Sequence, residues 1–311
     1  MIQFVIFFAI FSISAFAEKN ESAPKDVKTY TEMKYNSKSY KLRIRAPELK
    51  QGNLAVMKII PEEQSLGPEN FKVTWMGADL RLEKYKESLV SLIPISPEAS
   101  PYDSLLVIEK KSGNETEIKK FRIPVEKTAF QTRKMYSELK VPTNFKTRKY
   151  SDETLTFIQK CEEKKKAVFS AVNNFFANGK FVKPLKKIYV TSPFYVKRMY
   201  RPNDKGKPHG GIDFRGRKGE KIYAIQDGKV AIAEKMFFEG NFTVIDHGLG
   251  MFSLYMHQSK MHVKEGEFVK KGTLIGEVGS TGMSTGPHLH LGLKVNGTMV
   301  NPLKVIGLPL L

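Results

Sequence analysis

The amino-acid sequence predicts a mainly β protein in which two β domains are joined by a bridging helix. Short runs of alternating apolar and polar residues recur along most of the 311-residue chain, with turn-forming residues between them. This alternation is the pattern of half-buried strands, and strands at this spacing are typical of sandwiches and antiparallel sheets. One stretch near the middle has apolar residues at helical spacing instead. We therefore expect a small N-terminal β-sandwich, a bridging helix and a C-terminal domain of antiparallel β-sheets.

The length and the composition fit a protein with two packed cores. The chain is long for one domain and comfortable for two, and 41% of its residues are hydrophobic. Cys161 is the only cysteine, so no disulfide can form within the chain and the cores must supply the stability. Cys161 stands in a charged helical stretch with no histidine beside it, so we expect a structural thiol rather than a nucleophile.

Residues 1–17 have the composition of a secretory signal peptide. They contain no charged side chain, and their apolar run is too short to span a membrane comfortably. Ala15 and Ala17 are small residues at the positions that a signal peptidase requires, and Glu18 begins a polar stretch. We expect export to the periplasm or the medium, whereas an uncleaved segment would anchor the chain in the membrane. Residues 18–38 show little periodicity and predict a flexible lead-in.

The formal net charge of +19 predicts an anionic partner. Cell-wall polymers, an anionic membrane face and nucleic acid all carry the required charge. The export signal disfavours nucleic acid, and we find no zinc-finger, aromatic RNA-binding or helix-turn-helix pattern. The alternative interpretation is that the positive charge serves solubility alone.

Residues 39–126 carry the first set of strand patterns and are expected to form the β-sandwich. Leu42 and Ile44 alternate with charged residues, and turn sequences such as residues 111–114 separate the later strands. No histidine occurs before His209, so we expect no catalytic cluster here. The predicted role of this domain is positioning, shielding or wall binding.

Residues 127–180 are expected to connect the two domains. Residues 127–150 mix basic and aromatic side chains, which can bind anionic polymers or form a solvated strand pair; we favour the strand pair. Ser151 is a typical N-cap residue, and the two acidic residues after it interact favourably with the dipole at the start of a helix. We therefore predict that a helix begins here. An apolar stripe follows as far as Phe175, and Gly179 supplies the stop.

Residues 181–311 return to strand-like alternation and are punctuated by glycines, for example over residues 229–233, 252–256 and 289–295. We predict an all-β domain of antiparallel sheets. Residues 263–272 resemble the hairpin of biotinyl and lipoyl carrier domains. Carriers need a modifiable lysine at an exposed tip and have no use for histidines, so we attribute this likeness to shared β topology.

Four of the six histidines are candidates for a metal site. His288 and His290 alternate along a predicted strand, so their side chains face the same way about 7 Å apart. His209 and Asp213 add an imidazole and a carboxylate, both zinc ligands, and His257 ends another strand. Three ligands with one position open to water is the arrangement of a catalytic zinc. An isolated His-x-His would equally fit a surface pair on an edge strand.

Together these motifs resemble the lysostaphin/LytM-type zinc metallopeptidases, a family that cuts peptide bonds in bacterial peptidoglycan. The resemblance rests on His209-x3-Asp213, on Tyr-Met-His at residues 255–257 and on Gly-Pro-His-Leu-His at residues 286–290. Any one motif is weakly specific, but three in this order with these gaps are strongly specific. The resemblance covers residues 185–306 and implies a LytM-type peptidase domain, which in some relatives follows a small β domain.

Two further segments extend the resemblance, Ser-Pro-Phe at residues 192–194 and Gly-Ser-Thr-Gly at residues 279–282. The chain departs from the family at Tyr195, because relatives usually have glycine after this phenylalanine. Tyr195 lies outside the zinc motifs, so the departure concerns the local turn more than the chemistry.

The resemblance implies that His209, Asp213 and His290 bind one Zn²⁺ per chain. Bound zinc lowers the pKa of water to about 7, which supplies hydroxide for attack on a peptide carbonyl. His257 and His288 correspond to the two catalytic histidines that are not ligands. One would act as general base and the other would stabilise the oxyanion. We favour His288 as the base because it shares a strand face with His290.

The predicted function is an exported, monomeric zinc endopeptidase that hydrolyses peptide bonds in the stems or cross-links of peptidoglycan. The predicted partners are peptidoglycan and an anionic cell-wall or membrane surface, and not nucleic acid. The alternative is a catalytically silent, wall-binding regulator of other cell-wall hydrolases. Family members cut glycine bridges or bonds involving D-alanine and diaminopimelate. The sequence does not reveal which residues would form a specificity pocket.

Three residues near the predicted site are assigned other roles. His247 is expected to be a structural turn histidine at a strand end, and His262 a surface residue. Tyr255 shares a strand face with His257, so it could hydrogen-bond in the site or pack in the core.

Overall fold

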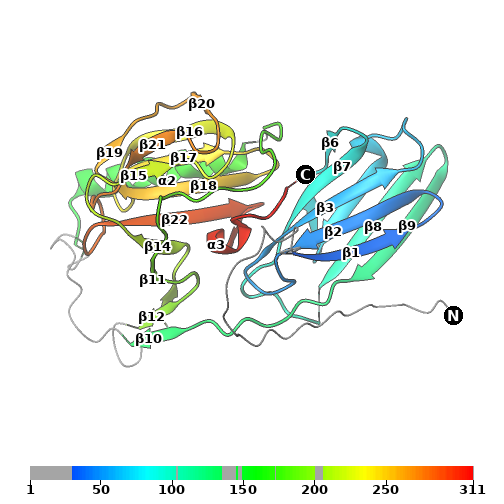
Figure 1. Cartoon of the computed structure of the whole chain (residues 1–311), viewed down its shortest axis with the longest axis horizontal. Helices are drawn as coiled ribbons and strands as arrows, with labels where there is room; N and C mark the ends of the chain where they lie inside the picture. The colour runs from blue at the N-terminus through cyan, green and yellow to red at the C-terminus, as the bar shows by residue number, and fades with distance from the viewer. Residues whose placement is uncertain are drawn as a thin grey trace, which may run out of the picture.

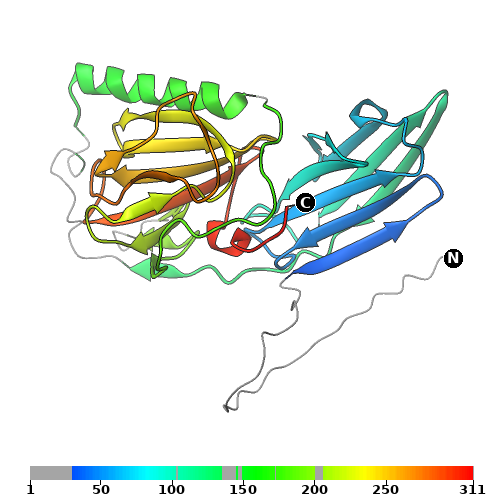
Figure 2. The same ribbon diagram turned by 45° about the horizontal axis from the view of Figure 1, so that its top comes forward.

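The computed structural model describes residues 30–102, 104–134, 145, 149–171, 173–199 and 206–310. Within this part of the chain two β domains lie side by side, and a long helix runs along one of them (Figure 1, Figure 2). The mainly β fold class is confirmed. The predicted signal peptide and the first part of the predicted lead-in lie outside the described residues, as do Lys140, Lys146 and Arg148 of the predicted connector. No helix in the described ranges combines the length and hydrophobicity needed to cross a membrane.

The N-terminal domain is a sandwich of two antiparallel sheets. The first sheet has five strands in the order β1 (Thr31–Asn36), β2 (Tyr40–Ala46), β3 (Leu54–Pro61), β7 (Ser88–Pro94) and β6 (Glu83–Tyr85). The second has four strands in the order β5 (Ala78–Leu80), β4 (Phe71–Trp75), β8 (Leu105–Ser112) and β9 (Glu115–Arg122). A short 3₁₀ turn, η1 (Pro68–Asn70), precedes β4.

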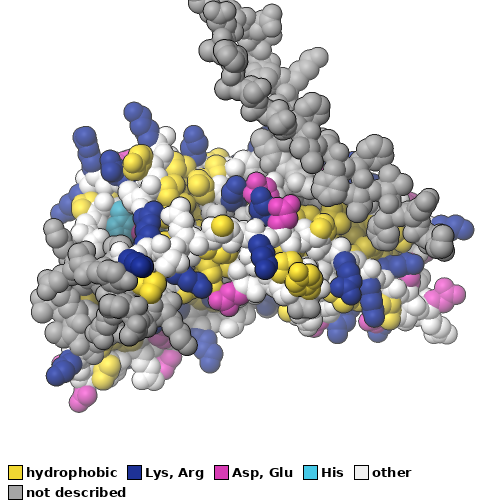
Figure 3. Space-filling model, turned by 90° about the horizontal axis from the view of Figure 1, so that it is seen from below, with side chains coloured by type: hydrophobic (Ala, Val, Ile, Leu, Met, Phe, Trp, Pro, Cys, Tyr) yellow, Lys and Arg dark blue, Asp and Glu magenta, His cyan; other side chains and the backbone are white. Residues whose placement is uncertain are grey.

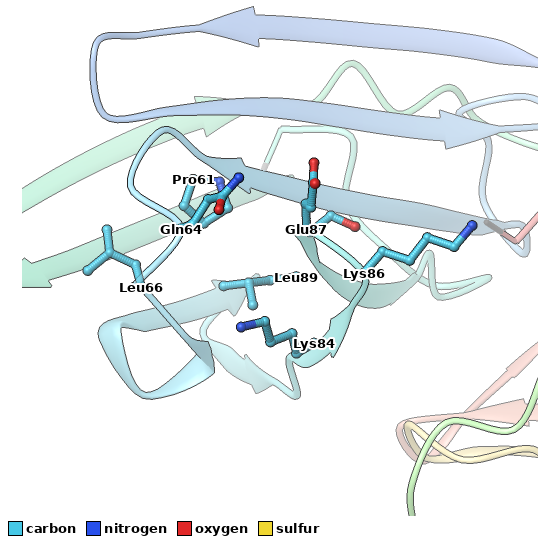
Figure 4. A pocket seen from close by; sticks show the side chains of 8 residues that line it. Pro61, Gln64, Leu66, Lys84, Lys86, Glu87 and Leu89 are labelled. Carbon is cyan, nitrogen blue, oxygen red and sulfur yellow. The ribbon is translucent and has the colours of Figure 1, made fainter.

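Strand β2 shows why these residues form a half-buried sheet. Its apolar residues alternate with charged ones, and every second side chain is buried against the other sheet. Trp75 of the second sheet packs in the same core, and its indole N–H donates to the carbonyl oxygen of Pro94 in the first sheet at 3.1 Å. A hollow of this domain (Figure 4) is lined by two lysines, three other polar residues and three apolar ones, and none of these is a histidine.

The C-terminal domain is built on an antiparallel sheet. Its strands follow the order β11 (Val190–Ser192), β14 (Ile212–Arg215), β22 (His288–Val295), β18 (Met251–Gln258), β17 (Gly240–Asp246), β16 (Gly228–Met236) and β20 (Phe268–Val269), with β23 (Thr298–Val300) paired to β22. A second sheet contains β15 (Lys221–Tyr223), β21 (Leu274–Glu277) and β19 (Lys260–Met261). One large apolar cluster, which includes Phe214, Ile222, Ile275 and Leu291, joins the two sheets.

A small third sheet lies beside this domain. It contains β10 (Thr132–Lys134), β12 (Lys197–Met199) and β13 (Lys207–Pro208), and β10 runs parallel to β12. Arg133 and Lys134 of β10 are exposed and pair with β12, which lies outside the connector, so the strand pair that we favoured within residues 127–150 stays a prediction.

The helix α2 (Asp152–Ser170) begins where the sequence predicted. The Ser151 hydroxyl accepts from the backbone N–H of Thr154 at 3.3 Å, which caps the first turn. Cys161, Val168 and Phe169 pack on the outer face of the large sheet, so α2 covers that sheet and buries the thiol (Figure 2).

The predicted end of this helix, near Gly179, was wrong. The helix ends at Ser170, and Ala171 is extended. The following segment instead hydrogen-bonds to the C-terminal domain: the N–H groups of Phe176 and Ala177 donate to the carbonyl oxygen of His247 at 2.9 and 3.3 Å. Tertiary hydrogen bonds therefore replace the helical ones that the apolar stripe suggested.

The two domains share apolar and polar contacts. Leu54, Val56, Val90 and Leu92 of the first sheet join the apolar cluster of the C-terminal domain. The short helix α3 (Pro302–Val305) lies near the same boundary, and the backbone N–H of Asn301 donates to Gly52 at 2.7 Å. These contacts dock the N-terminal domain on the C-terminal one.

Candidate metal centre

Strands β14 and β22 place acidic and basic side chains on one face of the large sheet. Their antiparallel register pairs Asp213 with His290 and Arg215 with His288. The intervening residues, Phe214 and Leu289, are fully buried on the opposite face. The predicted alternation of β22 is therefore correct, and the two histidines share a face with Asp213.

His209 reaches the same place from the segment after β13. Its backbone N–H donates to Val196 at 3.0 Å, and its carbonyl oxygen accepts from Tyr195 at 2.9 Å. Its ring Nδ1 lies 3.0 Å from the carbonyl oxygen of Pro193, where an N–H would donate. This contact orients the ring and leaves Nε2 free to face the cluster.

Three donor atoms converge at this point. His209 Nε2 lies 3.0 Å from both His290 Nδ1 and Asp213 Oδ1, and the last two atoms are 2.8 Å apart. All three residues are almost completely buried. Ligands of a tetrahedral zinc with bonds of about 2.1 Å stand about 3.4 Å apart, so small shifts would admit the ion. Two imidazoles and one carboxylate are a donor set suited to zinc, and the residues present fit this metal.

The electrostatics favour the metal-binding forms of Asp213 and His290. Burial of Asp213 acts to raise the carboxyl pKa, but hydrogen bonds and charge interactions with His209 and His290 outweigh it and hold that pKa well below its usual range. Burial lowers the pKa of His290, although Asp213 opposes this. An ionised Asp213 carboxylate and a neutral His290 imidazole are the forms that bind a metal ion.

Arg198, on β12, contacts the outer side of the cluster. Its guanidinium donates to Asp213 Oδ2 at 2.8 Å and to the Ser192 hydroxyl at 2.6 Å. Asp213 therefore has one oxygen held by an arginine, while Oδ1 faces the histidines. The sequence analysis missed Arg198, because no local pattern distinguishes it from the other basic residues of its segment.

His257 and His288 complete the cluster. Their ring centroids are 4.9 Å apart, and His257 is 6.2 Å from His290 by the same measure. His288 Nδ1 lies 2.8 Å from the carbonyl oxygen of Gly286, and His257 Nδ1 lies 2.8 Å from that of Thr281. With Nδ1–H donating, each ring has its Nε2 available as a proton acceptor. All five predicted site residues thus lie together.

The backbone at His257 is unusual. Its φ is +63°, in the left-handed region that side chains with a Cβ rarely adopt. Its N–H donates to the carbonyl oxygen of Glu239 at 2.8 Å, which helps to hold this conformation at the end of β18. Burial, reinforced by His288 and His290, lowers the pKa of His257 to about 3. The sequence could place His257 at a strand end but could not reveal this strained conformation.

Tyr195 has a left-handed backbone conformation. Its φ is +59°, in the left-handed region that glycine adopts most readily, which fits the glycine that the resemblance led us to expect there. Its hydroxyl donates to Glu98 in the N-terminal domain at 2.5 Å, and its ring centroid is 4.8 Å from that of Phe130. These contacts compensate the strain and tie the segment that holds His209 to the N-terminal domain.

The remaining residues singled out by the sequence lie elsewhere. His247 is fully buried, with Nδ1 2.7 Å from the backbone carbonyl oxygen of Asp227 and Nε2 2.8 Å from the Ser253 hydroxyl oxygen. The Tyr255 hydroxyl, 3.1 Å from Ser253 Oγ, accepts from a backbone N–H in the core. His262 contacts Glu277 at the surface. Tyr255 is therefore a core residue, and His247 is structural as predicted.

This buried hydrogen-bond chain makes the stability sensitive to acid. Burial lowers the pKa of His247 to about 4, whereas an unfolded histidine titrates near 6.5. Between these values the unfolded chain binds the extra proton. The contribution of His247 to the free energy of unfolding is therefore complete above pH about 6.5 and is lost as the pH falls to about 4, by about 3 kcal/mol.

Denaturant unfolding at several pH values between 4 and 7 measures this loss. We expect a His247→Gln variant to be less stable at pH 7 and to lose less stability on acidification. Equal slopes of unfolding free energy against pH in the two proteins would contradict the assignment.

Comparison with known proteins identifies the C-terminal domain. Residues 207–302 match the profile of Peptidase family M23. The C-terminal domain belongs to this family. An uncharacterized metalloprotease of Haemophilus influenzae is 42% identical over 120 residues, which is 37% of this chain and 25% of that protein. The peptidoglycan DD-endopeptidase ShyB of Vibrio cholerae is 38% identical over 123 residues, which is 39% of this chain and 29% of ShyB.

A third relative is the DD-carboxypeptidase/endopeptidase Mpg of Neisseria meningitidis, 39% identical over 124 residues, which is 40% of this chain and 28% of Mpg. The chain thus spans between a quarter and a third of these relatives. A putative M23 peptidase structure from Pseudomonas aeruginosa matches 84% of this chain and 96% of its own length, with a TM-score of 0.59 and 23% identity. That match shows that the two proteins share their fold over more of the chain than the peptidase domain.

Proposed function

We propose that this protein is an exported zinc-dependent endopeptidase that hydrolyses peptide bonds in the stems or cross-links of peptidoglycan. The observation that carries the proposal is the convergence of His209, Asp213, His290, His257 and His288 within the M23 domain. The named activities of ShyB and Mpg support peptidoglycan as the substrate.

His209, Asp213 and His290 would hold the metal through one atom each. When bound, zinc would supply a Lewis acid and lower the pKa of a coordinated water. Arg198 holds Oδ2 of Asp213 and so directs Oδ1 toward the other ligands. Because the three residues are buried, they would be fixed before substrate arrives, and little reorganisation would be needed.

His257 and His288 would handle protons and charge. Both rings have Nδ1 fixed by a backbone carbonyl, so either Nε2 can accept the proton of the attacking water. The protonated ring could then donate to the carbonyl oxygen as negative charge develops, or to the leaving amine. We keep His288 as the proposed base, since it shares a strand with the proposed ligand His290.

The connector and the peptidase domain are proposed to follow the predicted boundaries. The sandwich begins earlier than residue 39, because β1 (Thr31–Asn36) of its first sheet falls inside the predicted lead-in of residues 18–38. Its proposed role is positioning or wall binding. We propose that the protein acts as a monomer on peptidoglycan and that its positive charge favours an anionic wall or membrane surface. Export to the periplasm or the medium is proposed from the composition of residues 1–17.

Digestion of defined muropeptides with product identification by mass spectrometry tests the activity and names the bond that is cut. We expect peptide products whose formation stops when a chelator removes the metal. Wall binding without any product, by protein that contains zinc, would favour the regulator of other hydrolases instead.

The net charge of +19 leads to a separate prediction about binding. Binding to purified anionic wall should weaken as salt rises, because exposed charges are screened beyond about 8–10 Å at physiological ionic strength. Neutralising Arg133, Lys134, Arg148 and Lys149 together should reduce sedimentation with wall material. Hydrolysis of a small neutral peptide mimic is the control and should change little. If wall binding does not change with salt concentration, the positive charge serves solubility alone.

A further inference from the structure

Arg215 ends β14 on the same face of the sheet as the metal centre. It is directly paired with His288 and stands two residues from Asp213 on its own strand. Side chains of paired residues begin about 5 Å apart, and residues two apart on a strand are separated by about 7 Å. The side chain of Arg215 therefore begins beside a proposed catalytic histidine.

Tyr189 holds this arginine. The backbone N–H of Arg215 donates to the carbonyl oxygen of Tyr189 at 2.8 Å, and the guanidinium carbon lies 4.4 Å from the centroid of the tyrosine ring. Both side chains are exposed, Tyr189 by 58%. A guanidinium supported by a ring keeps N–H donors available for another group and loses little freedom when it binds one.

The positive charge of Arg215 is not neutralised within the described part of the chain. No carboxylate there lies within ion-pair distance of it, whereas Arg198 pairs with Asp213 and Arg45 pairs with Glu32. Figure 3 shows histidine surface beside Lys and Arg side chains on the face seen from below. An arginine whose guanidinium is supported by a ring and has no acidic partner, on a strand that carries a proposed metal ligand, is suited to bind a carboxylate.

We propose that Arg215 is a specificity-determining residue that binds a carboxylate of the peptide substrate. This inference rests on the proposed function. The carboxylate would belong to the part of the substrate that passes over the end of β14, where Arg215 lies. It is either the C-terminal carboxylate of a peptide stem or the side-chain carboxylate of its diamino diacid.

Two pairs of synthetic stem peptides test this assignment in the zinc-loaded, full-length protein. One pair differs only in a free or amidated C-terminus, and the other only in a free or amidated side-chain carboxyl group. We expect Arg215→Gln to lower kcat/KM by about 10- to 100-fold for the free carboxylate of one pair, mainly through KM. The amidated partner of that pair should change less than about twofold. The pair that responds identifies the source of the carboxylate.

Arg217→Gln is the matched control, because it removes the same charge from an exposed residue just beyond the strand. It should behave as wild type on all four peptides. Arg215→Lys keeps the charge but loses the planar donors, and should retain part of the preference. Affinity for non-hydrolysable versions of the peptides, measured by calorimetry, should fall in parallel for Arg215→Gln.

The outcomes separate this inference from the proposed function. If the wild-type protein cleaves no peptide and no muropeptide, the proposed function fails. If it cleaves them but Arg215→Gln loses activity equally on free and amidated peptides, or on neither, Arg215 does not recognise a carboxylate and its contact with Tyr189 is surface packing alone.

Discussion

Replacing His288 with alanine is expected to abolish most hydrolysis and leave the metal in place. His288 is proposed to transfer protons, and its Nε2 lies 3.7 Å from Asp213 Oδ1 at the edge of the cluster. Removal of a general base typically costs a factor of about 10²–10⁴ in rate. Because His288 is not a proposed ligand, the purified variant should keep about one zinc per chain.

Two companion variants make this result specific. His257→Ala should also keep zinc and lose activity, because its ring faces the same cluster from β18. His262→Ala removes a surface histidine that contacts Glu277 and should leave both zinc and activity unchanged. Loss of zinc in His288→Ala would mean that His288 and His290 have exchanged roles.

The second large effect is expected for Asp213→Ala, which should lose most of its zinc together with its activity. The substitution removes the oxygen that lies 3.0 Å from His209 and 2.8 Å from His290. Two imidazoles remain, and Arg198 then carries a positive charge that has lost its carboxylate partner. Both changes weaken the attraction for a divalent cation.

Asp213→Asn is the conservative companion of this variant. It keeps an oxygen for Arg198 and the size of the side chain but removes the negative charge, so zinc affinity should fall while the fold is retained. Elemental analysis and circular dichroism of both variants measure occupancy and folding. Full zinc occupancy in a folded Asp213→Ala protein would exclude Asp213 as a ligand.

Much of the candidate site could be predicted because its residues follow regular local patterns. The alternation of His288 and His290 with leucines is sufficient to place both rings on one face of β22. His209 and Asp213 are close in sequence and belong to one motif. Resemblance to a known family supplied what local patterns cannot, which is that these segments meet in space.

The parts that could not be predicted depend on contacts between segments distant in sequence. Arg198 reaches Asp213 from another sheet, and the residues beside Arg198 in the sequence give no sign of this contact. The early end of α2 reflects hydrogen bonds to His247, which lies far along the chain. Tyr195 looked like a departure from its family, yet its left-handed backbone and its bond to Glu98 account for it.

The central claim is that zinc held by His209, Asp213 and His290 enables hydrolysis of peptide bonds in peptidoglycan. The most direct test removes the metal from the purified protein, incubates it with peptidoglycan and analyses the soluble products by mass spectrometry before and after zinc is restored. We predict no peptide cleavage without metal and recovery of specific peptide products with one equivalent of zinc per chain. Undiminished cleavage by the metal-free protein would contradict the claim.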